Sequence, residues 1–386
     1  MTALLLFVRV RIVVDYRPAL RERSGVGEYI HHLVDRLAAG PGRHDEIVLF
    51  SSSLRHALGA TPIAGTRIRN RRVPVRVLNW LWHRFSWPPI ELLASGRVDV
   101  AHSPHPLLMP AKAAAQVITI HDLDFLTPPE RTQGEVQRDY PKLVRRHAHL
   151  ADHIVVNSAH TAGEVHQRLE VPRRCITVCR PGAPAWPARK STPERGHILF
   201  VGTLEPRKNV PGLLDAYERV LGAHPDAPDL VLAGRATGAA SGWLKRLAAP
   251  PLEGKVRHLG YVPDAIRREL YEGARLLVLP SFHEGFGLPV LEAMTVGVPV
   301  VASDRGAISE VLGDAGMLVD PDDPDDMADA IVSMLYDKKL EAQASARGLR
   351  RSLTFNWRGS AEALHAAYRQ AVAFKRDRQR AFARRR

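Results

Sequence analysis

The sequence predicts an α/β protein built from two consecutive parallel sheets, each flanked by helices. The chain has 386 residues, which exceeds one ordinary hydrophobic core and suggests two domains. Short apolar strand-like runs alternate with amphipathic helical stretches in both halves, as expected for parallel strands joined by crossover helices. Residues 181–196 are rich in Pro, Gly and Ala and lack periodicity, so they are the best candidate for a linker.

Strand and helix patterns follow one another in the same order on both sides of this linker. Strands are expected at residues 11–15, 47–50, 98–102, 116–121 and 154–157, then at 197–201, 230–233, 256–259, 276–279 and 299–302. Helices are expected at residues 27–37 and 159–169, then at 210–221, 264–273, 289–295 and 357–373. We therefore expect an N-terminal domain over 1–185, a C-terminal domain over 196–355, and a helix with a basic tail over 356–386.

Composition points to a globular protein of the cytoplasm. Hydrophobic residues make up 45% of the chain, and no apolar run reaches the roughly 20 residues that a membrane helix needs. Residues 1–8 are apolar, but Arg9 and Arg11 follow them, whereas a secretory signal carries its basic residues first. We expect residues 1–8 to form a poorly ordered extension. Cys175 and Cys179, with no metal-ligand spacing around them, are expected to be reduced structural thiols on one face of a strand.

The net charge of +13 is unevenly distributed. Residues 1–190 hold 27 Lys and Arg against 16 Asp and Glu, and residues 375–386 hold seven against one. Such a distribution suggests an anionic partner, either nucleic acid or a membrane surface. No nucleic-acid-binding signature accompanies the charge, so we favour an anionic membrane. The stretch that could dock there carries Arg67, Arg69, Arg71, Arg72, Arg76 and Arg84 around Trp80, Trp82, Phe85 and Trp87, although packing of these aromatics in the core is the more ordinary interpretation.

The strongest motif is residues 280–294, PSFHEGFGLPVLEAM, which follow a predicted strand. Pro289 suits the first turn of a helix, so Glu284 should lie in the loop and Glu292 in the helix. The N–H groups of Phe286, Gly287 and Leu288 can point at an anion at the helix N-terminus. Two carboxylates beside a phosphate would repel it, so we expect them to bind neutral sugar hydroxyls.

A second motif, residues 200–209, FVGTLEPRKN, combines a strand end, a glycine turn and two cations. Arg207 and Lys208 can neutralise a pyrophosphate, Arg in bidentate fashion and Lys as a point charge. Two weaker signals lie in the first half. His121 and Asp122 follow a strand, and Gly25, Val26 and Gly27 join a strand to a helix. Gly25–Gly27 lack the full dinucleotide fingerprint, so NAD binding is not supported.

Residues 280–302 resemble the E-x7-E motif and the following strand of the retaining glycosyltransferases of family 4. The resemblance extends from Ile12 to about Tyr368. It implies the GT-B fold, in which two Rossmann-like domains face one another across a cleft and the C-terminal helix crosses back to the first domain. It also implies a nucleotide-sugar donor held by the C-terminal domain, and a glycan or lipid-linked acceptor held by the N-terminal domain.

The resemblance assigns roles to individual residues. It places Glu284 and His121 against the donor sugar, Glu292 on the ribose, and Lys208 and Arg207 on the diphosphate. Thr203 stands where the family usually has Arg, so the role of Arg207 is the less secure of the two cations. Additional donor contacts are expected at Gly202, Thr203, Gly234, Arg235, Tyr261, Val262, Phe286, Gly287 and Leu288. The diphosphate and acceptor loop is expected at Gly25, Val26, Gly27 and Asp122.

The expected reaction is transfer of a hexose with retention of configuration, by a front-face path in which the leaving diphosphate assists deprotonation. The string from Glu205 to Asn209 is similar to that of mannosyltransferases and suggests GDP-mannose. No cofactor or metal is expected, because the Asp122–Asp124 pair falls in the N-terminal domain, away from the diphosphate cations. Two alternatives stay open: a nucleotide-sugar epimerase of the same fold, and a non-catalytic protein that binds nucleotide sugars or glycans.

Overall fold

The computed structural model describes residues 9–20, 25–53, 58, 62–126 and 140–383, and it divides into two compact units. Unit 1 comprises Met1–Leu123, Glu135–Gly182 and Asn356–Arg386, and unit 2 comprises Asp124–Gly134 and Ala183–Phe355. The predicted extension over residues 1–8 lies outside the described residues. Each unit contains its own parallel sheet and its own hydrophobic core.

The sheet of unit 1 has seven parallel strands in the order β3-β2-β1-β4-β5-β6-β7. The strands are β1 (Arg11–Asp15), β2 (Glu46–Ser52), β3 (Arg67–Arg71), β4 (Val100–Ser103), β5 (Ala115–Ile120), β6 (His153–Val156) and β7 (Ile176–Val178). β1 is central, and Ile12 pairs with Ile47 on one side and Val100 on the other. The strand order reverses at β1 and β4, which makes their carboxyl ends the switch point where open parallel sheets bind ligands.

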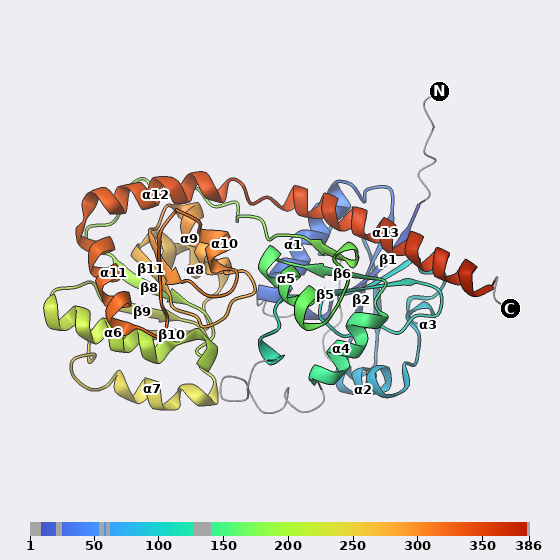
Figure 1. Ribbon diagram of the computed structural model, residues 1–386, viewed down its shortest axis with the longest axis horizontal. Helices are drawn as coiled ribbons and strands as arrows, with labels where there is room; N and C mark the ends of the chain where they lie inside the picture. Colours follow the sequence, from blue (N-terminus) through green and yellow to red (C-terminus); the bar gives the residue numbers. More distant parts are fainter. Residues whose placement is uncertain (1–8, 21–24, 54–57, 59–61, 127–139, 384–386) are drawn as a thin grey trace, which may run out of the picture. The chain divides into compact units, whose positions relative to one another are not determined.

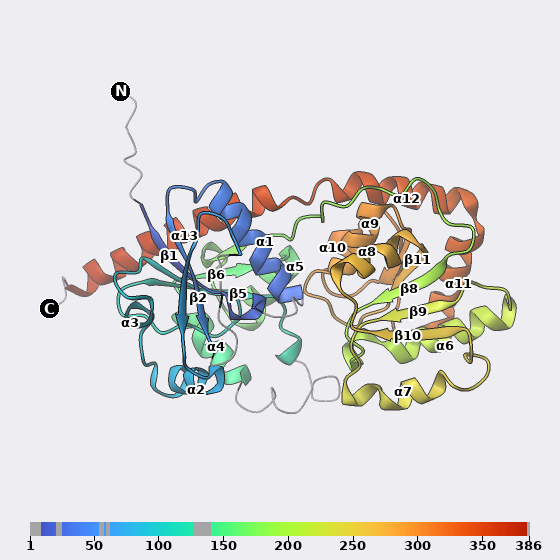
Figure 2. The same ribbon diagram turned by 180° about the vertical axis from the view of Figure 1, so that it is seen from behind.

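Helices cover both faces of this sheet. They are α1 (Gly25–Ala39), α2 (Val75–Phe85), α3 (Ile90–Ala94), α4 (Tyr140–Leu150), α5 (Ala159–Arg168) and α13 (Trp357–Ala383). Ile12 and Val14 pack with α1 and α13, whereas Val13 packs with α2 and α3. This follows from the alternation of side chains along β1. Figures 1 and 2 show α13 running along the same side of the unit 1 sheet as α1.

The long helix α13 is tied to unit 1 by buried polar contacts as well as by apolar packing. The Tyr368 hydroxyl lies 2.7 Å from Nδ1 of His102, whose Nε2 lies 2.8 Å from the Thr119 hydroxyl. His102 is fully buried, and burial lowers its pKa to about 3, so it is neutral at pH 7. The expected return of the C-terminal helix to the first domain is confirmed.

Unit 2 has a six-stranded parallel sheet in the order β10-β9-β8-β11-β12-β13. Its strands are β8 (His197–Val201), β9 (Leu230–Ala233), β10 (Val256–Gly260), β11 (Ala274–Leu279), β12 (Val300–Ser303) and β13 (Met317–Val319). Its helices are α6 (Val210–Ala223), α7 (Ser241–Arg246), α8 (Asp264–Glu272), α9 (Leu288–Val296), α10 (Ile308–Leu312), α11 (Pro324–Tyr336) and α12 (Lys338–Ser352). The prediction of an α/β fold with two Rossmann-like halves is confirmed.

Several local predictions need correction. Gly25–Gly27 form the first turn of α1 rather than a loop, and a Cβ on Gly27 would lie 2.6 Å from the Pro18 carbonyl oxygen. Cys175 ends a 3-10 turn and Cys179 follows β7, so the two thiols do not share a strand. Cys179 is buried, and burial raises its thiol pKa to about 12.

The basic-aromatic stretch also contains elements that periodicity did not reveal, namely strand β3 and helix α2. Trp82 packs in the core of unit 1 and donates its indole N–H to the Pro88 carbonyl at 3.0 Å. Trp80, Phe85 and Trp87 are instead 59%, 57% and 56% exposed. The stretch is therefore divided between the core and the surface.

Candidate active site

The residues of the two strongest motifs meet in unit 2, at the carboxyl edge of its sheet. β8 ends at Val201, within the 200–209 motif, and β11 ends at Leu279, directly before the 280–294 motif. These strands are neighbours in the sheet, so their loops lie side by side. The Phe282 amide donates to the Arg207 carbonyl at 2.8 Å and links the two loops directly.

Glu284 and Lys208 form a buried ion pair where the loops meet. Lys208 Nζ contacts Glu284 Oε1, and the Ser281 hydroxyl donates to the same oxygen at 2.8 Å. Arg207 Nη1 lies 3.5 Å from Glu284 Oε2. Burial alone would raise the pKa of Glu284, but Lys208 and Arg207 outweigh burial and hold that pKa at about 2. The carboxylate is therefore ionised at neutral pH.

Lys208 is in the opposite situation, because burial lowers its pKa and the Glu284 charge works against burial. The ammonium is only 6% exposed, and removal of Glu284 would leave it buried without this counter-charge. Arg207 is less buried and has other partners. Its Nε pairs with Glu205 at 2.7 Å and its Nη1 donates to the His283 carbonyl at 3.2 Å.

Glycines hold this loop cluster together where no side chain fits. A Cβ on Gly234 would lie 1.8 Å from the Gly202 carbonyl oxygen, and the φ of Gly234 is 151°. A Cβ on Gly306 would lie 2.6 Å from the Glu284 carbonyl oxygen, at a φ of 66°. Gly306 and Ser281 support Glu284 directly, but sequence reasoning gave neither a role.

Helix α9 begins directly behind Glu284, and Gly287 is its N-cap residue with a φ of 99°. Leu288 is the first helical residue and Pro289 the second, so the helix begins one residue earlier than predicted. Phe286 is buried against Phe355, with ring centroids 5.8 Å apart. Its side chain therefore belongs to the core, and only its backbone can serve a ligand.

Glu292 lies in the second turn of α9 and is anchored to α8. The Tyr271 hydroxyl donates to its Oε2 at 2.8 Å, and Arg267 Nη2 lies 3.2 Å from its Oε1. At the edge of the loop cluster, the Arg235 guanidinium lies 5.0 Å from the centre of the Tyr261 ring. Thr203, Arg235 and Tyr261 are exposed, whereas Val262 packs against the core of unit 2. The sequence motifs did not predict the roles of Tyr271 and Arg267.

Unit 1 contains the remaining predicted residues. His121 follows β5, its ring meets Tyr29 of α1 edge-on at 5.2 Å, and its Nε2 lies 3.0 Å from the Pro104 carbonyl oxygen. A carbonyl only accepts, so Nε2 carries the proton and Nδ1 is left as the acceptor. Burial lowers the pKa of His121, against the opposing effects of Pro104 and Asp122, and keeps the ring neutral at pH 7. Asp122 is half-buried beside it.

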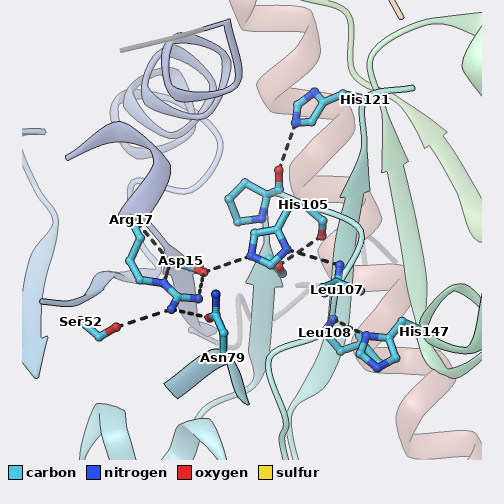
Figure 3. A network of polar contacts seen from close by, with 11 residues as sticks. Asp15, Arg17, Ser52, Asn79, His105, Leu107, Leu108, His121 and His147 are labelled. Carbon is cyan, nitrogen blue, oxygen red and sulfur yellow. Dashed lines mark hydrogen bonds and ion pairs between the residues drawn. The ribbon is translucent and has the colours of Figure 1, made fainter. Parts of the chain in front are cut away.

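A polar network at the switch point of unit 1 centres on Asp15 and Arg17, to which the sequence motifs gave no role (Figure 3). Asp15, which ends β1, is fully buried and accepts from Arg17 Nε at 2.8 Å and Nη2 at 2.6 Å. His105, in the loop after β4, approaches the same carboxylate at 3.5 Å. Burial would raise the pKa of Asp15, but Arg17 and His105 hold it well below its usual range. Arg17 also donates to Asn79 of α2 at 2.9 Å.

This network fixes the loop that orients His121. Pro104, whose carbonyl binds His121, directly precedes His105. Farther along the loop, the Leu108 amide donates to His147 Nδ1 at 3.0 Å. The signal in the sequence was a lone Asp at a strand end with Arg two residues later, which is too common to identify without coordinates.

The structure therefore groups the predicted residues into two sets. Glu284, Lys208, Arg207, Glu292 and the glycine loops share the carboxyl edge of the unit 2 sheet. His121, Asp122 and the first turn of α1 belong to unit 1. The unit 2 set offers cations, helix N–H groups and two anchored carboxylates, which is the chemistry that a phosphorylated polyol requires.

Comparison with known proteins agrees with this chemistry. Residues 195–337 match the model described as Glycosyl transferases group 1, and residues 23–186 match Glycosyltransferase Family 4. The O-antigen chain mannosyltransferase B of Escherichia coli is 30% identical over 90% of this chain and 96% of that protein. The phosphatidyl-myo-inositol mannosyltransferase of Mycolicibacterium smegmatis is 37% identical over 42% of this chain and 41% of that protein.

Solved structures show the same fold at low identity. Sucrose-phosphate synthase from Thermosynechococcus elongatus has a TM-score of 0.76 at 20% identity and covers 95% of this chain and 100% of that chain. WaaG, a glycosyltransferase involved in lipopolysaccharide biosynthesis, has a TM-score of 0.70 at 14% identity and covers 92% of this chain and 98% of that chain. With both halves matched by family models and a relative aligned along nearly its whole length, the chain belongs to glycosyltransferase family 4 and has the GT-B fold.

Proposed function

We propose that the protein transfers a hexose, with retention of configuration, from a nucleoside diphosphate donor bound by unit 2 to an acceptor bound by unit 1. The observation that carries the proposal is the cluster in which Lys208 and Arg207 meet Glu284 at the N-terminus of α9. Cations and helix N–H groups suit the diphosphate, and an ionised carboxylate beside them suits hydroxyls of the sugar.

In this proposal, catalysis is chiefly electrostatic. As the bond between the anomeric carbon and the diphosphate breaks, negative charge develops on the phosphate oxygens, where Lys208, Arg207 and the amides at the start of α9 stabilise it. Glu284 is already ionised and anchored by Ser281, so it needs no rearrangement to accept hydrogen bonds from the sugar. Neutral His121 offers Nδ1 as an acceptor, and the leaving diphosphate takes the acceptor's proton.

The donor that we propose is GDP-mannose. Support comes from the string Glu205 to Asn209 and from the two relatives named as mannosyltransferases. A thermal-shift screen against GDP-, UDP-, ADP- and dTDP-sugars tests this, because a ligand that binds the folded state raises the melting temperature. A shift with GDP-mannose supports the proposal, whereas a shift with UDP-sugars alone would exclude GDP-mannose and keep the transferase function.

A transfer assay separates the transferase from its alternatives. Release of GDP from GDP-mannose should require an acceptor, and Lys208→Ala should lower turnover strongly while Glu292→Ala weakens donor binding. Conversion of the donor to an isomer without acceptor would instead indicate an epimerase. Donor binding without transfer to any member of a glycan and lipid-linked acceptor panel would indicate a binding protein.

For the acceptor, we propose the switch point of unit 1, where His105 is 30% exposed and is held by Asp15. His105→Ala should raise the KM for the acceptor and leave the binding of the nucleoside diphosphate unchanged, since His105 belongs to unit 1 and the residues proposed for the diphosphate and ribose belong to unit 2. If His105→Ala weakened donor binding instead, the division of roles between the units would be wrong.

We further propose that unit 1 docks on an anionic membrane surface that carries a lipid-linked acceptor. Trp80 and Phe85 of α2 meet edge-on at 5.2 Å, and both are more than half exposed, as is Trp87. Arg76 and Arg84 are exposed on the same helix. Aromatic side chains beside cations suit the interface of an anionic bilayer. In the described part of the chain, no helix has the length and hydropathy to span a bilayer.

Liposome flotation tests the docking surface. The protein should float with vesicles that contain phosphatidylglycerol and not with pure phosphatidylcholine, and the paired change Trp80→Ser with Arg84→Glu should abolish flotation. The matched control is Tyr336→Ser with Arg257→Glu, which alters exposed residues of unit 2 and should float normally. This proposal would be wrong if the protein floated equally with phosphatidylglycerol and with pure phosphatidylcholine vesicles. It would also be wrong if the unit 1 variant floated as well as the unit 2 control.

A further inference from the structure

Glu292 is held by two donors from one face of helix α8. Tyr271 and Arg267 are four residues apart on α8, and each contacts a different oxygen of the carboxylate, at 2.8 Å and 3.2 Å. The Glu292 side chain itself is 12% exposed, so solvent reaches part of it. Helix α8 thus fixes the orientation of the Glu292 carboxylate, and part of the Glu292 side chain remains accessible to solvent.

Trp186, in the segment just after the chain enters unit 2, packs on both of these donors. Its ring lies 5.8 Å from the Arg267 guanidinium and 5.8 Å from the Tyr271 ring. Arg267 also pairs with Asp264 one turn earlier on α8, at 3.2 Å. A guanidinium that stacks on a ring and pairs with two carboxylates has little rotational freedom. Trp186 and Asp264 therefore restrain Arg267, and Arg267 in turn restrains Glu292.

Tyr271 acts as a permanent donor. It is fully buried, and burial together with the neighbouring Glu292 charge raises its pKa well above its usual value of 10. Its hydroxyl therefore stays protonated across the physiological range and cannot exchange the roles of donor and acceptor with Glu292. Each carboxylate oxygen has two lone pairs, so one bond from α8 per oxygen does not exhaust its capacity to accept.

We propose that Tyr271, Arg267 and Trp186 are positioning residues that hold Glu292 ready to accept the 2′- and 3′-hydroxyls of a ribose. Two oxygens in a fixed plane match two neighbouring hydroxyls, and a sugar that lacks one or both of these hydroxyls forms fewer hydrogen bonds with them. The clamp therefore selects ribonucleoside over deoxyribonucleoside diphosphates. The inference rests on the donor site proposed for unit 2 and adds the residues that decide which nucleotides enter it.

The test is calorimetric titration of the full chain with GDP, UDP and ADP and with their 2′,3′-dideoxy counterparts. For the diphosphate that the wild type binds, Tyr271→Phe should weaken ribonucleotide binding about tenfold and leave dideoxynucleotide binding unchanged. Tyr336→Phe, at an exposed tyrosine of α11, is the matched control and should alter neither. Arg267→Lys, which keeps the charge and loses the planar fork, should act in the same direction.

Kinetics provide a second measurement that a merely structural role would not reproduce. Because the ribose is remote from the reacting carbon, Tyr271→Phe should raise the KM for the nucleotide sugar and leave kcat unchanged. Equal weakening of ribo- and dideoxynucleotides, no weakening, or a fall in kcat would overturn the clamp while leaving the transferase function intact. Failure of the wild type to bind GDP, UDP or ADP would overturn the donor site itself, and the clamp with it.

Discussion

Replacement of Glu284 by Gln tests the ion pair on which the proposed donor site depends. Gln keeps the size of the side chain and its ability to accept from Ser281, but it removes the charge that Lys208 and Arg207 face. Lys208, only 6% exposed, would then keep its buried ammonium without this counter-charge. Loss of one partner from a buried pair typically costs about 3–5 kcal/mol of stability.

The pKa of Glu284 gives an independent magnitude. A fall from 4.5 to about 2 corresponds to about 2.5 units, or roughly 3 kcal/mol of stabilisation of the folded state at neutral pH. Because this pKa is depressed on folding, the stabilisation is complete above pH 4.5 and is lost as the pH falls from 4.5 towards 2. Burial of Lys208 acts in the opposite direction, so roughly 3 kcal/mol is an upper value for the pair.

The assay is thermal unfolding of the two proteins at several pH values. At pH 7, Glu284→Gln should lower the melting temperature of unit 2 by up to roughly 6–12 °C, since the upper value is roughly 3 kcal/mol and about 1 kcal/mol shifts a domain of this size by about 2–4 °C. The difference should shrink steadily below pH 4.5 and nearly vanish near pH 2. Glu253→Gln, at an exposed glutamate of unit 2, is the control and should change little.

Two results would refute the reasoning. If Glu284→Gln melted within a degree of the wild type at pH 7, the ion pair would not stabilise the loop cluster. If the difference persisted unchanged into acid, its origin would be packing rather than charge. A lower melting temperature that recovers in acid is the result that only the ion pair explains.

Three more predictions follow from the same structure. Lys208→Ala should lower kcat for sugar transfer about 10²–10³-fold in a steady-state assay, because a buried cation no longer meets the developing phosphate charge; a change confined to KM would argue against this role. Gly234→Ala should destabilise unit 2 by at least about 2 kcal/mol in thermal scans, because its Cβ would lie 1.8 Å from the Gly202 carbonyl oxygen; normal melting would show that the loop can move apart. Tyr368→Phe should cost about 1–3 kcal/mol by leaving buried His102 without its partner at 2.7 Å, and unchanged unfolding would place that bond outside the stability of unit 1.

The sequence by itself determined the fold class and located the two motifs of the proposed donor site. In unit 2, strands β8 to β12 and helices α6, α8 and α9 were predictable, because buried parallel strands are short apolar runs and residues such as Pro289 and Gly287 mark a helix start. Strand β13 and helices α7, α10, α11 and α12 were not predicted. Glu284 and Glu292 were predictable because both lie in one continuous segment of the chain, a loop followed by a helix, and this segment alone determines the spacing between them. Lys208 belongs with them for the same reason, since it lies in the short segment between the end of strand β8 and the start of helix α6.

The sequence predicted less where the position of a strand or side chain depends on residues distant in the chain. Strand β3, with its Arg-rich composition, has an ordinary edge-strand pattern that periodicity does not reveal. Trp82 and Trp80 are two residues apart in a helix, so they point to different sides, but nothing local says which side is the core. Gly27 lies within helix α1 and not in a loop. Glycine is needed there because the backbone passes close to the Pro18 carbonyl.

Only the tertiary structure decided which groups hold the motif residues in place. Tyr271 and Arg267 reach Glu292 from another helix, and His105 reaches Asp15 from the loop after another strand. Such pairs join residues far apart in the chain, and each partner taken singly is an ordinary polar residue. The charge states of Glu284 and His121 also could not be predicted from the sequence. Burial and neighbouring charges determine the pKa of a side chain, and burial and neighbouring charges are properties of the folded chain.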